Sequence, residues 1–499
     1  MSIEKNTYKK AISHTVIYGV SDVLRKIVGF IMLPIYTHYL TPKDYGAVEM
    51  MMMVVMLVEV FLAMRMGQAI FRYYCTTKDD NEKKAVMSST FLMTFCTSTL
   101  AFLILRYNAN KATEIFLGDL QYADLMAIIA LLLVLQAIEE IGLIYVRAQQ
   151  RAVLFLGISV TKMFISLSLN IYFIVFLKLT VAGIVYSSVI STALMAVFST
   201  IYTFYHAGFR FSKSIIKKLV LFSYPLWFAA MGSIYTDSAV KYFLRIFSGL
   251  GSVGIYILAA QFASLVLVFI WVPFSNVWQT LRYEVYEMPN PNQIYKNIFI
   301  GLVLIFAIAG LGLSLFSETV IHIMADKAFW SASGVVPILV VGYIALALSN
   351  FNNFGILLKN KTGIFAVATY INAIAMTVGF VVLIPIAGFY GAAITFLIGS
   401  ISQLIWIEWK SKKLYHMQLP WWRVAFINIT WLVCYSFSLL LPSTLIVSII
   451  LKFMIFIGFI LLMFTMPILE KNEKEQIIFY IKSALLKASR YFPILKTNS

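Results

Sequence analysis

The sequence predicts an all-α integral membrane protein of about 14 transmembrane helices, arranged as two parallel six-helix bundles followed by two further helices. Three observations support this fold class. Hydrophobic residues make up 61% of the 499 residues and charged residues only 12%, whereas soluble proteins carry about 25% charged residues. Apolar windows recur along the whole chain, giving a mean hydropathy of +0.87. Glycine landmarks also repeat between the two halves.

Each predicted helix is a window of about 20 mostly apolar residues, the length that crosses the hydrocarbon core. The windows are 14–40, 46–66, 86–105, 123–145, 153–177, 182–205, 219–240, 254–275, 297–317, 335–357, 364–385, 387–407, 423–441 and 444–466. The polar, basic first ten residues precede no small-residue cleavage site, so the first window is expected to remain in the protein.

The distribution of basic residues predicts the orientation of the chain. If the N-terminus is cytoplasmic, 27 of the 39 Lys and Arg residues lie in cytoplasmic loops and tails and five lie in external loops. This asymmetry is a strong positive-inside signal and predicts that both termini are cytoplasmic. It also accounts for the net charge of +17 without nucleic acid as a partner.

Two glycine pairs indicate an internal repeat. Gly46 and Gly254 are 208 residues apart, and so are Gly183 and Gly391. Parallel repeats of this kind are a known transporter design, with the binding site between the halves. The predicted units are an N-terminal bundle, a C-terminal bundle, two additional helices and a basic amphipathic tail, at 1–205, 206–410, 411–469 and 470–499.

Basic residues inside the spans indicate the charge of the ligand that the interior binds. A cation at the centre of a spanning helix costs roughly 2.5–3.5 kcal/mol on insertion scales, so such residues face a cavity, a partner or a substrate. Their excess over acids predicts an anionic ligand. They are Arg25, Lys26, Arg65, Lys162, Lys241, Arg245 and Lys452, of which Arg65 and Lys452 are not assigned to the site.

Three groups of residues form the predicted binding site. Asp22, Arg25 and Lys26 share one face of the first span, although long basic side chains there also suit snorkelling to the interface. The fifth span carries a polar stripe through Lys162 near the membrane midplane. The seventh span carries a second, more external stripe, for which interfacial anchoring plus one salt bridge within the helix, between Asp237 and Lys241, is the alternative. The stripe on the fifth span comprises Ser159, Lys162, Ser166 and Asn170, and the stripe on the seventh span comprises Asp237, Lys241 and Arg245.

The acids in the spans are candidates for binding a coupling ion, H⁺ or Na⁺, although counter-ions for the basic residues are the commoner use. The candidates are Asp22, Glu59, Glu139 and Glu140. The three cysteines show no metal-ligand spacing, and no other metal, P-loop or nucleophile motif occurs. The sequence therefore predicts neither a metal nor another cofactor and does not favour an enzyme.

At this point the chain resembles the Wzx-type polysaccharide flippases of the multidrug/oligosaccharidyl-lipid/polysaccharide exporter superfamily. The resemblance covers essentially the whole chain, with one departure, since members often have Asp-Arg where this chain has Asp237-Ser238. It rests on the motifs Leu40-Thr41-Pro42, Asp44-Tyr45-Gly46, Phe222-Ser223-Tyr224-Pro225-Leu226, Val253-Gly254-Ile255-Tyr256 and Tyr390-Gly391-Ala392-Ala393-Ile394.

The resemblance implies a monomeric transporter of the bacterial inner membrane. Its cargo would be an oligosaccharide repeat unit on undecaprenyl pyrophosphate, destined for O-antigen, lipopolysaccharide, capsule or exopolysaccharide. The pyrophosphate would meet Arg25, Lys26 and Lys162, and the sugars would meet Ser166 and Asn170. Alternating access driven by an ion gradient would turn the head group over, and the polysaccharide polymerase machinery is an expected partner.

Three alternatives remain at this stage. A lipid II flippase of peptidoglycan synthesis has the same fold, the same number of spans and a cationic interior. A multidrug or cation antiporter shares the twelve-helix core, but a cationic cargo would favour an acidic interior. An O-antigen polymerase or ligase would carry a large external loop with catalytic Arg and His, and the longest external segment, about 106–122, has no such cluster.

Overall fold

The computed structural model describes residues 29–62, 67–441 and 445–465, and these residues are almost entirely helical. Residues 29–39 are helical and lead into the first bundle. The bundle consists of α2 (Pro42–Leu62), α3 (Gly67–Thr76), α4 (Asp80–Tyr107), α5 (Ala109–Phe116), η1 (Leu120–Tyr122), α6 (Ala123–Ile129), α7 (Leu132–Ala148), α8 (Ala152–Ile171), η2 (Tyr172–Phe176) and α9 (Thr180–Ala207).

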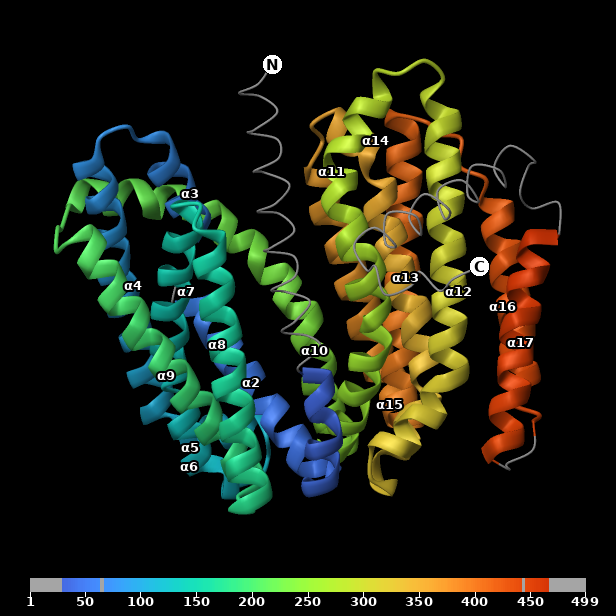
Figure 1. Cartoon of the computed structure of the whole chain (residues 1–499), viewed down its shortest axis with the longest axis horizontal. Coiled ribbons are helices and arrows are strands. Elements are labelled where there is room, and N and C mark those ends of the chain that lie inside the picture. The colour runs from blue at the N-terminus through green and yellow to red at the C-terminus, as the bar shows by residue number, and fades with distance from the viewer. Residues whose placement is uncertain (1–28, 63–66, 442–444, 466–499) are drawn as a thin grey trace, which may run out of the picture.

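The long helix α10 (Lys213–Val266) runs diagonally from the first bundle to the second (Figure 1). The second bundle continues with η3 (Leu267–Trp271), α11 (Val272–Tyr286), α12 (Pro291–Met324), η4 (Lys327–Gly334), α13 (Val336–Asn352), α14 (Phe354–Leu358) and α15 (Gly363–Leu414). Two last helices, α16 (Trp421–Ser438) and α17 (Leu445–Thr465), stand beside α12 at the edge of the molecule.

The described residues contain nine helices that are long and apolar enough to cross a membrane. Two of the longest helices each contain a break at a glycine, Gly249 in α10 and Gly388 in α15. At Gly388 the chain doubles back, and the two helical segments then lie against each other: a Cβ on Gly391 would lie 2.1 Å from the carbonyl oxygen of Leu383. Gly249 falls between the predicted seventh and eighth spans, 219–240 and 254–275, so a single glycine takes the place of the loop expected there. Gly388 falls at the start of the predicted twelfth span, 387–407.

The two bundles meet at the end of the molecule that carries α5, α6 and η4, which we call the contact end (Figure 1). The largest buried apolar cluster includes residues of both bundles there, such as Ala47, Met50, Val253, Tyr256 and Phe329. Toward the opposite end, which carries α3 and α14, the ribbons of the two bundles diverge. The two bundles therefore contact each other at the contact end.

The repeat predicted from glycine spacing appears as a pseudo-symmetric helix crossing. A Cβ on Gly46 would lie 1.9 Å from the oxygen of Leu250, and a Cβ on Gly254 would lie 2.1 Å from the oxygen of Pro42. Pro42 and Leu250, like the two glycines, are 208 residues apart. Small residues let helix backbones approach closely in membranes, so these glycines allow α2 and α10 to touch at the contact end.

The surface of the helices suits a bilayer. Ile446, Ile450, Phe453 and Met454 on α17 are exposed, and an apolar surface of this extent is unfavourable in water. The chain is a multi-pass membrane protein. The predicted tail, 470–499, lies outside the described residues, and the predicted boundaries between the bundles stay predictions.

Candidate functional site

The polar stripe predicted on the fifth span lies on α8 and faces the interior of the first bundle. Ser159 and Asn170 are both buried on this face. Asn170 donates from Nδ2 to the backbone oxygen of Ser166 at 2.8 Å and accepts at Oδ1 from the Tyr36 hydroxyl at 3.2 Å. The stripe is thereby linked to the helical residues 29–39.

A charged pair occupies the middle of this stripe. Lys162 donates to Oε2 of Glu139 on α7 at 2.5 Å. The Glu139 side chain is 7% exposed and the Lys162 side chain is 31% exposed. A buried carboxylate is costly without a cation, and the Lys162 ammonium supplies the opposite charge beside Glu139. The structure thus joins a predicted ligand-binding residue to a predicted coupling acid.

The remaining predicted acids separate in space. Glu140 follows Glu139 but points about 100° away around the helix, and it is exposed where Glu139 is buried. Glu59 is buried on α2. Asp22, Arg25 and Lys26 lie outside the described residues. Their assignment to ion coupling or ligand binding stays a prediction.

The second stripe, on α10, lies at the contact end and reaches the first bundle. Lys241 donates to Oε2 of Glu49 on α2 at 2.7 Å, with side chains 18% and 22% exposed. Arg245 donates to the backbone oxygen of Glu114 on α5 at 2.9 Å. Asp237 is exposed. The helix salt bridge considered as the alternative for this stripe is replaced by contacts that tie the two bundles together.

Further contacts across the bundles surround this stripe. Gln261 donates to the Tyr45 hydroxyl at 2.7 Å, and Thr37 donates to the backbone oxygen of Met324 at 3.2 Å. Sequence reasoning missed Tyr45 and Gln261 as functional candidates. The signal that points to Tyr45 is its position directly before Gly46, the residue at the helix crossing.

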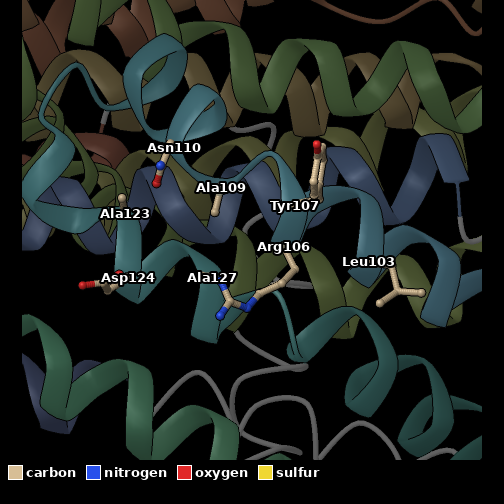
Figure 2. Close-up of a pocket in the computed structure, with 8 residues that line it drawn as sticks. All are labelled: Leu103, Arg106, Tyr107, Ala109, Asn110, Ala123, Asp124 and Ala127. Carbon is tan, nitrogen blue, oxygen red and sulfur yellow. The ribbon is translucent and has the colours of Figure 1, made fainter.

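The rim of the contact end is polar. Lys43 donates to Asp119 at 2.8 Å, and this hydrogen bond holds the pKa of the Asp119 carboxyl below its usual value. A pocket of about 460 Å³ lies nearby on the first bundle, with Arg106, Tyr107 and Asp124 among its lining residues (Figure 2). None of the predicted site residues lines this pocket.

Comparisons with known proteins identify the fold. A solved structure titled "Lipid II flippase MurJ, inward closed conformation" matches with a TM-score of 0.71 at 14% identity, covering 91% of this chain and 99% of that chain. An inward-facing multidrug resistance MATE family transporter of the MOP superfamily matches with a TM-score of 0.60 at 16% identity, covering 81% and 96%. A structure of an outward-facing multidrug resistance MATE family transporter of the MOP superfamily matches with a TM-score of 0.55 at 13% identity, covering 84% and 96%.

The sequence comparisons identify the family. No curated protein sequence matches the chain. The model of the family described as "Polysaccharide biosynthesis protein" matches residues 11–279, which is more than half of the chain. This match and the two-bundle fold confirm the resemblance drawn from the short motifs, and they point to transport of a lipid-linked or other membrane substrate. The chain belongs to the polysaccharide biosynthesis protein family, with the fold of the MurJ and MATE transporters.

Proposed function

We propose that the protein flips an undecaprenyl-pyrophosphate-linked oligosaccharide repeat unit from the cytoplasmic to the external leaflet of a bacterial inner membrane. The family match over residues 11–279 is the observation that carries this proposal. The polar stripe on α8 supports it, because a head group of sugars and phosphates needs polar partners inside the membrane. The delivered units would supply a surface polysaccharide such as O-antigen or capsule.

The Lys162–Glu139 pair suggests how cargo and ion are coupled. A pyrophosphate in the first bundle competes with Glu139 for the Lys162 ammonium through charge-assisted hydrogen bonds. Once Lys162 turns to the phosphate, the carboxylate of Glu139 is less compensated in a buried setting, and uptake of a proton relieves the cost. Binding of the cargo is thereby linked to protonation, which makes H⁺ the coupling ion in this scheme.

The rest of the cargo meets the other predicted residues. Arg25 and Lys26 add positive charge for the pyrophosphate, and Ser166 and Asn170 offer hydrogen bonds to the sugars. The lipid tail stays in the bilayer between the bundles. The protein works as a monomer and delivers its product to the polymerase machinery, without a cofactor.

The contact end is external in this proposal, because the positive-inside pattern places the α3 end in the cytoplasm. Contacts at the contact end then close the external side, and the state described receives cargo from inside. Lys241 and Arg245 hold this closure through Glu49 and the Glu114 carbonyl. When the external side opens, both cations are released and can meet the pyrophosphate.

A lipid II flippase is the second candidate, favoured by the structural match to MurJ. A multidrug antiporter is the third, favoured by the matches to MATE transporters. Both share the fold at low identity, so the nature of the cargo decides between the three.

The experiment that tests the proposal deletes the gene in its own host and analyses membrane lipids by mass spectrometry. A flippase for a polysaccharide unit predicts accumulation of undecaprenyl-pyrophosphate oligosaccharide and loss of the surface polysaccharide. Accumulation of lipid II with arrested cell-wall growth would favour the second candidate. An unchanged lipid pool with new sensitivity to cationic dyes would favour the third.

A further inference from the structure

A second polar pocket lies in the second bundle, away from the α8 stripe. It has a volume of about 420 Å³ and lies between the contact-end portions of α12, η4, α16 and α17. In Figure 1 these last two helices stand on the side of the molecule opposite to α8. Volumes of this size accommodate small ligands, and no predicted site residue belongs to this pocket.

The pocket contains a balanced pair of charges. Lys452 on α17 donates to Oε2 of Glu318 on α12 at 2.7 Å, with side chains 7% and 55% exposed. An ammonium has three N–H donors, and the described residues supply one acceptor, so two donors remain for a ligand. Because the carboxylate and the ammonium offset each other, the pocket suits a neutral ligand better than an ion.

The hydroxyl groups of the pocket are arranged as acceptors. Ser314 and Ser438 each donate to a backbone oxygen of their own helix, at 2.8 and 2.6 Å, and Ser333 does the same at 2.7 Å within η4. A serine oxygen that has donated its hydrogen still accepts. The pocket thus offers several acceptors beside the Lys452 N–H donors that no described residue accepts.

A ligand with many hydroxyl groups matches this lining. Sugar hydroxyls donate to the serine oxygens and Glu318 and accept from Lys452, and the aromatic ring of Tyr435 also lines the pocket. A zwitterionic phospholipid head group satisfies the charge pair but brings donors only on its ammonium, which leaves most serine oxygens unused. The lining therefore favours a sugar over a phospholipid head group.

We propose that this pocket binds a neutral sugar of the repeat unit at the external face, as a second site that the unit occupies after it has been turned over. The inference rests on the proposed function, since it takes the same cargo and the same orientation. In this proposal α16 and α17 help to receive the head group, and Lys452, which lies outside the α8 stripe, donates hydrogen bonds to the sugar.

The test places a photoreactive benzophenone amino acid at Ser448, which lines the pocket, in the full chain in its own host. Matched positions are Ser166 in the α8 stripe and Tyr107, which is 90% exposed at the contact end of the other bundle. Cells are irradiated with and without synthesis of the repeat unit, and adducts on the protein are identified by mass spectrometry.

We expect a glycan adduct at Ser448 and at Ser166 only in cells that make the repeat unit, and none at Tyr107. In the Lys452→Gln background the yield at Ser448 should fall about tenfold, while the yield at Ser166 stays. A Ser438→Ala variant keeps the charge pair and should also lower the adduct yield at Ser448. It tests the pocket independently if the Lys452→Gln variant fails to fold.

Other outcomes separate the two proposals. A glycan adduct at Ser166 without one at Ser448 overturns the second site and leaves the flippase intact. A phospholipid adduct at Ser448 in both kinds of cell assigns the pocket to a lipid head group instead. Absence of glycan adducts at both positions contradicts the proposed function as well.

Discussion

The helix crossing at Gly46 and Gly254 offers the sharpest prediction, because a single methyl group should force the two helices apart. In Gly46→Ala the new Cβ would lie 1.9 Å from the Leu250 oxygen, and in Gly254→Ala it would lie 2.1 Å from the Pro42 oxygen. A carbon and a carbonyl oxygen approach no closer than about 3.3 Å. The helices must therefore separate by roughly 1.4 Å in the first variant.

The separation would break the hydrogen bonds beside the crossing. The Lys241–Glu49 and Gln261–Tyr45 contacts both measure 2.7 Å. Lengthened by about 1.4 Å they would reach about 4.1 Å, beyond hydrogen-bond range. One charged and one neutral hydrogen bond together contribute about 3 kcal/mol, which corresponds to a roughly hundredfold shift away from the state with a closed contact end.

The assay measures access to a buried position next to the stripe. Ala239 is 6% exposed on α10, so an Ala239→Cys probe is introduced after the native Cys75, Cys96 and Cys434 are replaced by serine. A membrane-impermeant maleimide is added from outside the cells. Labelling should be at least about tenfold faster in the Gly46→Ala background, and export of the polysaccharide should fall.

The matched control is Gly251→Ala, one helical turn before Gly254. A Cβ at Gly251 meets nothing within 4 Å, so this variant should label and export like the parent. If Gly46→Ala and Gly251→Ala behave alike in both assays, the crossing does not set the closure and the reasoning fails.

Three other changes have defined outcomes. Lys162→Gln should lower the free energy of unfolding by about 3 kcal/mol, because it removes the cation beside buried Glu139. The double variant Lys162→Gln with Glu139→Gln should recover the melting temperature in detergent but should not recover export of the polysaccharide. Recovered export in the double variant would show that Lys162 does not belong to the binding site. Glu49→Lys and Lys241→Glu should each reduce export of the polysaccharide, whereas the double variant that carries both changes should regain it. If the double variant exports no better than either single variant, the Lys241–Glu49 contact does not contribute to transport. Gly388→Ala should cost about 1–3 kcal/mol in thermal unfolding, because Gly388 has φ 54° and ψ −131°, which only glycine adopts without strain.

The fold was accessible from sequence because its signals are repetitive. Apolar windows of spanning length and the spacing of Gly46 and Gly254 gave the two bundles. The spacing did not predict that these two glycines lie at a helix crossing, which the structure shows through the close approach of the backbones there. The break at Gly249 lies in the segment predicted between two spans, whereas the break at Gly388 lies inside the predicted window 387–407, because a reversal at one glycine leaves no polar segment to mark it.

The partners of the charged residues could not be predicted in the same way. Lys162 and Glu139 lie on different helices, and the helical rotation that brings them to 2.5 Å depends on packing. For Lys241, the intrahelical partner Asp237 was the local expectation, but packing of α2 against α10 supplies Glu49 instead. Sequence order alone does not give these interhelical distances.

The central claim is that this chain moves a lipid-linked oligosaccharide across a bilayer, and a vesicle assay tests it most directly. The purified full chain is reconstituted into vesicles that contain the undecaprenyl-pyrophosphate oligosaccharide isolated from the deletion strain. An impermeant oxidant then consumes sugars exposed on the outside. The account predicts that the protein makes the whole pool accessible and that Lys162→Gln slows this loss. If the inner-leaflet share stays protected with and without the protein, at neutral pH and under an imposed proton gradient alike, the account is contradicted.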